Sequence, residues 1–385
     1  MSTTPVVFDR KLFMIFGITL MVVMGVSSVM PVLPLIARTF DLSPASVGLA
    51  ITSFTLPGIV LAPIGGVLAD RLGRKRVLVP ALILFALGGS LCALATTLPQ
   101  LLFCRFVQGI GAAPLGVLYT TLIGDLYDGN ARIRAMGFNA AALSLGTAIY
   151  PALGGIMGEL GWNVPFLLPL LALPLCILVI RTPLPEPMER TSMRVYLKAT
   201  ARIAFSGAAF TLFGLTLLTF TLLYGPMVTY FPLLADTQFS ASPSTIGFIF
   251  AAASAGTMIT ASRLGSLAET IHPRHLIMAS CVAYAIAMLL MPTVTSLWWL
   301  MGPVFIYGLG QGLNFPNLTV LLTGLAPTEG RAAIMAINGT VLRLAQTIAP
   351  PLFGLLFSQW GMPGVYTGGA IVACCMFVLT LLRLR

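Results

Sequence analysis

The sequence predicts an all-α membrane protein whose twelve transmembrane helices form two pseudo-symmetric bundles of six. Hydrophobic residues make up 58% of its 385 residues, and the mean hydropathy is +0.98, well above that of soluble domains. The apolar runs are about twenty residues long, which is the length that crosses about 30 Å of hydrocarbon. The two halves of the chain also resemble each other at a fixed offset. Together these observations favour a polytopic membrane protein over a soluble enzyme.

Short polar stretches separate the apolar runs and give the expected span boundaries. The first run is kept as a span because it is too long for a signal peptide and no small-residue cleavage site follows it. The twelve expected spans are residues 12–37, 44–69, 76–97, 99–123, 133–158, 163–181, 204–234, 244–263, 274–292, 296–322, 331–357 and 364–382.

The charges indicate the orientation in the membrane. The chain has 21 Lys and Arg residues and a net charge of +10, and most of the basic residues fall in loops on the side of the N-terminus. This bias predicts that both termini are cytoplasmic, in a bacterial or archaeal cytoplasmic membrane, and it explains the positive charge without a nucleic-acid partner. The six cysteines all lie inside spans and show no disulfide or metal-binding spacing. We therefore expect no metal and no cofactor.

An internal repeat divides the chain. A shift of 199 residues aligns glycines, prolines and loop charges in register without a gap. We expect an N-terminal bundle at 1–181, a cytoplasmic linker at 182–203 and a C-terminal bundle at 204–385. Two parallel repeats predict a binding site near the membrane midplane at their interface, opened alternately to each side. Aligned pairs include Pro44/Pro243, Gly48/Gly247, Gly109/Gly308, Pro151/Pro350 and Gly155/Gly354.

The loop after the second expected span, GVLADRLGRKR at 66–76, concentrates charge in a chain that is only 8% charged. Gly66 would let the second span pack closely against a neighbour. Gly73 would permit the tight turn between two antiparallel helices. Asp70 lies at a helix end, where a carboxylate can face the positive N-terminus of another helix. A simple topology anchor needs positive charge alone and explains neither Asp70 nor the glycines.

This loop resembles the signature G-x-L-A-D-R-x-G-R-R/K of the major facilitator superfamily, with Gly66, Asp70, Arg71, Gly73 and Arg74 in place. The resemblance implies the major facilitator fold. It also implies a conformational latch on the cytoplasmic side. In such a latch the carboxylate at 70 faces the start of the eleventh span near 328–331, and the arginine at 74 pairs with an acid at the end of the fourth span. Asp125 is the candidate for that acid.

The fourth expected span carries RFVQGIGAA at 105–113, which resembles the superfamily motif R-x-x-Q-G-x-G-A. Arg105, Gln108, Gly109 and Ala112 fall on one helical face. The resemblance implies a role for Arg105 and Gln108 in proton coupling. The alternative is that Arg105 extends to the nearby membrane interface, because it lies only about 9 Å from the start of the span.

The fifth expected span carries GFNAAALSLGTAIYPALGG at 137–155, which resembles the motif of drug and metabolite antiporters. The resemblance implies hinge or packing positions and favours export as the direction of transport. Tyr150 replaces a glycine of the motif. The alternative is that these small residues serve only helix packing, as they do in many membrane helices. The positions concerned are Gly146, Tyr150, Pro151, Gly154 and Gly155.

Arg343 is the most informative single residue. It lies twelve residues after Arg331, so about 18 Å along the eleventh span, where a charge facing lipid would be costly. We expect it to face the central cavity. All eleven acidic residues fall at span ends or in loops, which suits an anionic or zwitterionic substrate better than a cationic one. The alternative is that amides satisfy Arg343. Polar groups expected to line the same cavity are Gln346, Asn338, Asn139, Gln311, Asn314 and Tyr224.

These features predict a secondary transporter that moves a small organic molecule by alternating access, with proton-coupled efflux as the leading interpretation. Uptake or exchange of an organic anion centred on Arg343 is the alternative, and a non-transporting membrane sensor is a remote one. The chain has no phosphate-binding loop and no nucleophile–base arrangement, so we expect neither ATP drive nor an enzyme. The expected partners are the substrate, protons and the lipid bilayer, with the protein as a monomer.

Overall fold

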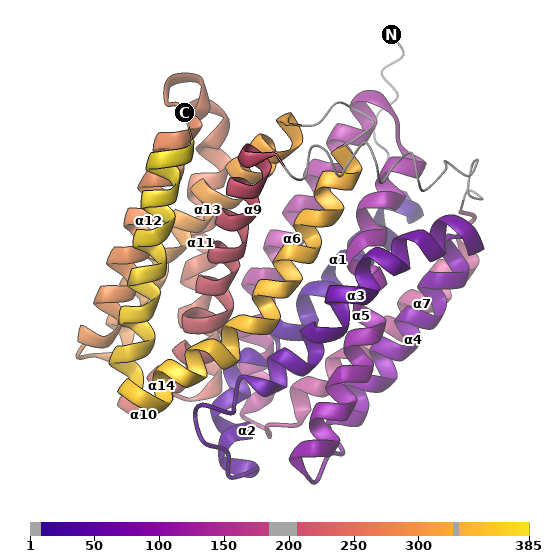
Figure 1. Cartoon of the computed structure of the whole chain (residues 1–385). Coiled ribbons are helices and arrows are strands. Elements are labelled where there is room, and N and C mark those ends of the chain that lie inside the picture. Colours follow the sequence, from indigo (N-terminus) through magenta and orange to yellow (C-terminus); the bar gives the residue numbers. More distant parts are fainter. Residues whose placement is uncertain (1–8, 185–205, 326–330, 385) are drawn as a thin grey trace.

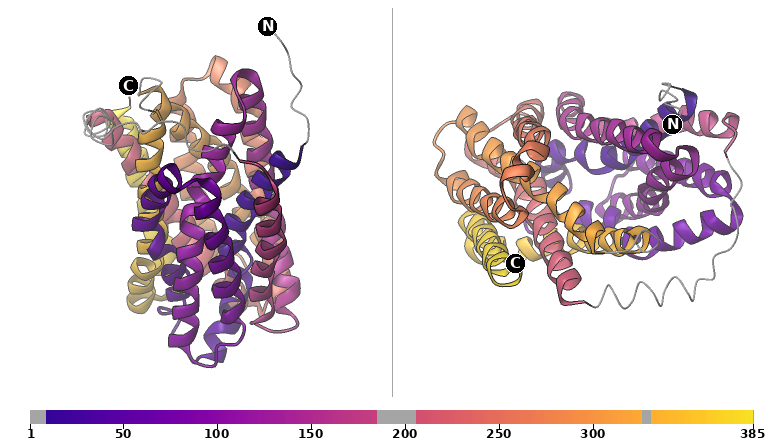
Figure 2. Two further views of the ribbon diagram at one scale, coloured as in Figure 1. Left: turned by 90° about the vertical axis from the view of Figure 1, so that its right-hand side faces the viewer. Right: turned by 90° about the horizontal axis from the view of Figure 1, so that it is seen from above.

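The structure is a computed structural model that describes residues 9–184, 206–325 and 331–384, and within these residues it contains helices and no strands. Figures 1 and 2 show a bundle of long helices, which run roughly side by side. The expected linker at 182–203 lies almost wholly outside the described residues. We call the end of the bundle where α1 begins and α14 ends the Arg10 end (top in Figure 1). The opposite end, with α2 and α10, is the Arg38 end.

The first half of the chain begins at a capped helix, because the Asp9 carboxylate accepts a hydrogen bond from the Leu12 N–H at 2.9 Å. Its elements are α1 (Arg10–Ser27), η1 (Met30–Val32), α2 (Leu33–Thr39), α3 (Leu49–Leu72), α4 (Arg74–Cys92), α5 (Leu98–Leu126), α6 (Gly129–Gly158), η2 (Val164–Leu171) and α7 (Ala172–Arg181).

The second half contains two irregular features. The seventh expected span passes through a π-helical segment, and α14 combines the last two expected spans across a kink at Gly361, whose φ is 62°. The elements are α9 (Gly207–Leu222), η3 (Leu223–Tyr230), α10 (Phe231–Phe239), α11 (Pro243–Thr270), α12 (Pro273–Leu290), η4 (Met291–Thr293), η5 (Leu297–Leu300), α13 (Met301–Gly324) and α14 (Arg331–Arg383).

Ten segments of the described chain are long and apolar enough to cross a membrane. One of them, within α14, is 50 residues long and covers two of the expected spans. The tenth expected span corresponds to α13, which is outside that set and carries Gln311, Asn314 and Asn317 along its middle. The fold is thus an all-α membrane bundle, and its segments are consistent with twelve spans.

The offset of 199 residues recurs in the helix packing. A Cβ atom built on Gly109 of α5 would lie 2.1 Å from the carbonyl oxygen of Phe54 on α3. A Cβ atom on Gly308 of α13 would lie 2.0 Å from the carbonyl oxygen of Ala253 on α11. Both members of the second pair lie 199 residues after those of the first. Equivalent glycines therefore bring equivalent helices into backbone contact, as the repeat predicts.

Candidate functional site

At the Arg38 end the two halves meet where α6 crosses α11. A Cβ atom on Gly247 would lie 2.1 Å from the carbonyl oxygen of Pro151, and one on Gly155 would lie 2.3 Å from that of Pro243. Gly154 is equally confined, because its Cβ would lie 1.9 Å from the carbonyl oxygen of Ser28. No side chain fits at these positions. The crossing therefore depends on glycine.

The second crossing, between α3 and α14, repeats the first. A Cβ atom on Gly354 would lie 2.6 Å from the carbonyl oxygen of Ala45, and one on Gly48 would lie 2.6 Å from Cβ of Pro350. The glycines and prolines of the two crossings are related by the 199-residue offset. The motif on the fifth span thus has a counterpart on the eleventh, and both pack against the opposite half. Tyr150, which replaces a glycine of the motif, is buried beside Gly146.

Polar contacts between the halves accompany these crossings. Arg38 pairs with Asp236 at 2.6 Å. The Ser244 hydroxyl donates to Glu159 Oε1 at 2.6 Å, and the Ser244 N–H donates to the same oxygen at 3.2 Å. Every hydrogen bond found between residues 9–184 and 206–384 of the described chain lies at the Arg38 end or midway along the bundle. In this conformation the described helices are closed at the Arg38 end. The remaining such contacts are Tyr230 to Pro44, Thr52 to Thr347 and Thr347 to Thr55.

The Glu159 contact predicts a pH effect. Hydrogen bonds from Ser244 and Ser242 lower the pKa of the Glu159 carboxyl below its ordinary value of 4.5. The contact is therefore fully formed above that value and is lost as the pH falls through the lowered pKa. We expect acidification below about pH 4.5 to widen the Arg38 end. The widening should be smaller in Glu159→Gln, which titrates no carboxyl at this position.

The distance between nitroxide labels at residues 160 and 238, both exposed on this face, measures the effect. An identical pH response in the wild type and in Glu159→Gln would assign the widening to another group.

The loop between α3 and α4 forms a charge cluster at the Arg10 end. Arg74 donates from Nε to Asp125 Oδ2 at 2.8 Å, the pairing expected from the sequence, and it also pairs with Asp70. Gly73 has a φ of 100° and ends α3, as expected for a turn glycine. The expected partner of Asp70 near 328–330 lies outside the described residues. Arg71 is exposed.

The expectation that Gly66 permits close helix packing is wrong. A Cβ atom on Gly66 would meet Val117 at 3.5 Å, an ordinary contact distance. The close approach occurs at its neighbour Gly65, whose Cβ would lie 2.7 Å from Cβ of Pro114. The residue that matters for packing is therefore one position earlier, on a different face of α3.

Arg105 is fully buried within the first half of the chain. Its Nε donates to the carbonyl oxygen of Ala50 at 3.0 Å, and its Nη1 donates to the carbonyl oxygen of Gly25 at 2.8 Å and to Gln108 Oε1 at 2.7 Å. The guanidinium lies 4.4 Å from the centre of the Phe54 ring. The alternative in which Arg105 extends to the membrane interface is therefore wrong. Arg105 instead links α1, α3 and α5 through backbone oxygens.

Arg343 lies in the first part of α14, near the middle of the eleventh expected span, and reaches across to the first half. A Cβ atom on Gly58 of α3 would lie 3.1 Å from Arg343 Cδ, and one on Gly116 of α5 would lie 2.7 Å from Arg343 Nη2. These two glycines leave the room that the guanidinium occupies. Tyr119 and Tyr224 are close enough to interact electrostatically with it. Arg343 is half-buried and takes part in none of the three ion pairs found between described residues.

The amides expected around Arg343 are divided between several places. Gln346 contacts it directly, accepting from Nη1 at 3.1 Å. Asn338 is buried nearby on α14, and its Oδ1 has no hydrogen-bond partner among the described residues. Asn139 instead accepts from the Thr19 hydroxyl at 2.7 Å, between α6 and α1.

Gln311 and Asn314 make their hydrogen bonds away from Arg343. The Tyr284 hydroxyl donates to Gln311 Oε1 at 2.6 Å, and Asn314 Nδ2 donates to Thr219 Oγ1 at 2.7 Å. These amides form a separate polar cluster between α9, α12 and α13. Sequence reasoning also missed Gly58 and Gly116, because nothing separates them from the other glycines among the 38 of the chain.

Comparisons with known proteins agree with the fold. The family model of the Major Facilitator Superfamily matches residues 15–240 and 212–385. The class D tetracycline resistance protein of Salmonella ordonez is 27% identical over 94% of this chain and 95% of its own. The bacillibactin exporter of Bacillus subtilis (strain 168) is 25% identical over 91% and 90%. The crystal structure of a D-xylose-proton symporter superposes with a TM-score of 0.79 at 17% identity, covering 98% and 97% of the two chains. The chain belongs to the Major Facilitator Superfamily and is a membrane transporter.

Proposed function

We propose that the protein exports a small organic molecule with an anionic group, by alternating access and at the expense of a proton gradient. The names of the relatives that match most of the chain, a tetracycline resistance protein and an exporter, support export as the direction. The observation that carries the anionic substrate class is Arg343, whose guanidinium lies between the halves without an acidic partner among the described residues.

An unpaired guanidinium at this depth favours an anionic ligand for electrostatic reasons. Removing the charge from water is costly, and a single amide oxygen from Gln346 offsets little of that cost. A carboxylate or phosphate would restore the lost solvation through two parallel, charge-assisted hydrogen bonds. Gln346 leaves Nη2 and Nε of Arg343 for this purpose.

The same geometry relates binding to the transport cycle. Arg343 belongs to α14 of the second half, whereas Gly58 and Gly116 belong to the first. An anion held by Arg343 therefore lies at the boundary between the two moving parts. With the proposed topology the Arg38 end is periplasmic, so the closed Arg38 end corresponds to an inward-facing state. Asp70, Arg74 and Asp125 would act as the latch in the opposite state, against the start of α14.

A second candidate function is uptake or exchange of an organic anion through the same site. The positions of the acidic residues in the described chain favour this function, because all of them lie at helix ends or in loops. The site around Arg343 therefore has no carboxyl group that could carry a proton. Proton coupling through Arg105 and Gln108 would have to act on neutral neighbours, because their contacts are backbone oxygens and each other.

A thermal-shift experiment on the purified protein tests the substrate class. Matched acids, amines and neutral amides of one carbon skeleton are compared as ligands. We expect acids alone to raise the Tm, and we expect Arg343→Ala to weaken their apparent affinity by about tenfold or more, the size of a charge-assisted hydrogen bond. Gly116→Ala should weaken it too, because the new methyl group displaces Nη2.

Arg263→Ala, at an exposed position on α11, is the matched control and should bind acids as the wild type does. Stabilisation by amines, or by acids equally in Arg343→Ala, would refute the anionic substrate.

A further inference from the structure

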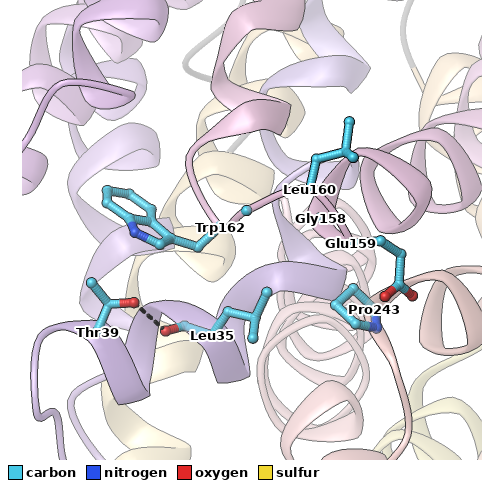
Figure 3. Close-up of a pocket in the computed structure, with 8 residues that line it drawn as sticks. Leu35, Thr39, Gly158, Glu159, Leu160, Trp162 and Pro243 are labelled. Atoms are coloured by element: carbon cyan, nitrogen blue, oxygen red, sulfur yellow. Dashed lines mark hydrogen bonds between the residues drawn. The ribbon is translucent and has the colours of Figure 1, made fainter.

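The Arg38 end contains a cavity of about 360 Å³ that lies outside the central site. Its walls come from α2, from the end of α6 with the loop that follows, and from the first residue of α11 (Figure 3). This volume is near the lower limit of about 300 Å³ for small-molecule sites. The lining residues are Leu35, Thr39, Gly158, Glu159, Leu160, Gly161, Trp162 and Pro243.

The cavity combines an acidic group, an aromatic ring and apolar side chains. In Figure 3, Trp162 and Glu159 lie on opposite sides, with Leu35 between them. The indole is held edge-on by Phe40 and Phe166, at ring-centre distances of 5.1 and 6.0 Å. Packing from two sides fixes the indole as a rigid wall. Indole faces attract organic cations, and the attraction grows when a carboxylate is near.

The charge of Glu159 is not neutralised by a basic side chain. Its Oε1 accepts from Ser244, but none of the three ion pairs between described residues includes it. Arg38, next to the lining residue Thr39, is paired with Asp236. The cavity is thus lined by an ionised carboxylate whose hydrogen-bond donors are neutral.

The cavity also depends on the conformation. Pro243 belongs to the second half, and the remaining lining residues belong to the first. Gly158 lies at the junction, where a Cβ atom would be 2.4 Å from Val32 Cγ1 and 3.0 Å from Pro243 Cβ. When α6 and α11 separate at this end, the Pro243 wall and the contact between Ser244 and Glu159 are lost. The complete cavity therefore exists only while the Arg38 end is closed.

We propose that this cavity is a second, state-specific site that binds a small organic cation of the substituted-ammonium class. The carboxylate of Glu159 supplies the counter-charge, the indole of Trp162 supplies the cation–π surface, and Leu35 and Leu160 contact the apolar substituents. A ligand that binds one conformation stabilises it. Occupancy of the site holds the Arg38 end closed and slows transport without competing for the site at Arg343.

Calorimetric titration of the full-length protein with phenyltrimethylammonium tests this proposal, with tert-butylbenzene as the uncharged isostere. We expect the cation to bind and the isostere to bind at least fivefold more weakly. Glu159→Gln keeps a side-chain oxygen for Ser244 but removes the charge, and should weaken cation binding at least fivefold. Trp162→Leu should weaken it as well. Asp41→Asn, at an exposed carboxylate outside the cavity on the same face, is the matched control and should leave binding unchanged.

Two further measurements separate this site from the central one. Arg343→Ala should bind the cation as the wild type does. Nitroxide labels at residues 94 and 238, both exposed at the Arg38 end and outside the cavity lining, should show a narrower distance distribution when the cation is present. Equal binding of the isostere, or unchanged cation binding in Glu159→Gln, would overturn the proposal. Loss of cation binding in Arg343→Ala would place the cation in the central cavity and would also overturn it.

Discussion

Replacing Gly247 by alanine is expected to abolish transport by preventing closure of the Arg38 end. The new Cβ would lie 2.1 Å from the carbonyl oxygen of Pro151. That oxygen belongs to the backbone of α6, and the Cβ is attached rigidly to the backbone of α11. Neither can move alone, so α6 and α11 must separate. An alternating-access transporter that cannot close one end cannot complete its cycle. Transport in proteoliposomes should fall to background, while the protein remains folded.

Gly265→Ala is the matched control for this variant, because Gly265 lies on the same helix and a Cβ atom there meets nothing within 4 Å. It should transport as the wild type does. The labels at residues 160 and 238 should report a larger separation in Gly247→Ala than in Gly265→Ala. Wild-type transport by Gly247→Ala would show that the crossing of α6 and α11 is not needed for the cycle.

Replacing Arg105 by leucine is expected to cause the largest loss of stability. The substitution leaves the carbonyl oxygens of Gly25 and Ala50 and the side chain of Gln108 without their donor in a dry interior. A buried polar group without a partner costs about 1–3 kcal/mol, so the free energy of unfolding should fall by several kcal/mol. Arg105→Lys should recover only part of the lost free energy of unfolding, because one ammonium group cannot reach all three acceptors.

The Tm of the purified variants measures this effect, with Arg134→Leu at an exposed position of α6 as the control. The same variants distinguish a structural role of Arg105 from a role in proton coupling. A positioning role predicts that Tm and transport fall together. A role confined to proton coupling predicts that Arg105→Lys keeps the wild-type Tm and loses only the dependence of transport on the proton gradient. That outcome would contradict the structural role inferred here.

Features that depend on chain length and local pattern could be predicted from the sequence. The spans follow from hydropathy, and the turn at Gly73 follows from the need for a positive φ. The pairing of Arg74 with Asp125 was expected from the family motif and is present. The 199-residue repeat predicted equivalent positions, and the structure brings them into contact at Gly109 and Gly308.

Features that depend on how helices face one another could not be predicted. Backbone carbonyls are identical in every sequence, so nothing marked Gly25 and Ala50 as acceptors for Arg105. The depth of Arg343 placed it near the midplane, but helix tilt decides that it lies against Gly58 and Gly116. In the same way, the orientation of α13 directs Gln311 towards Tyr284. The polarity of Gln311 would equally have suited a place beside Arg343.

The most direct test of the proposed function is counterflow of a radiolabelled organic acid in proteoliposomes, using an acid that stabilises the purified protein. Wild-type protein, Arg343→Ala and the control Arg263→Ala are compared, and the uncharged amide of the same acid serves as a competing ligand. The account predicts accumulation by the wild type and the control, background uptake by Arg343→Ala, and no competition by the amide. Wild-type counterflow by Arg343→Ala, or equal competition by the amide, would contradict it.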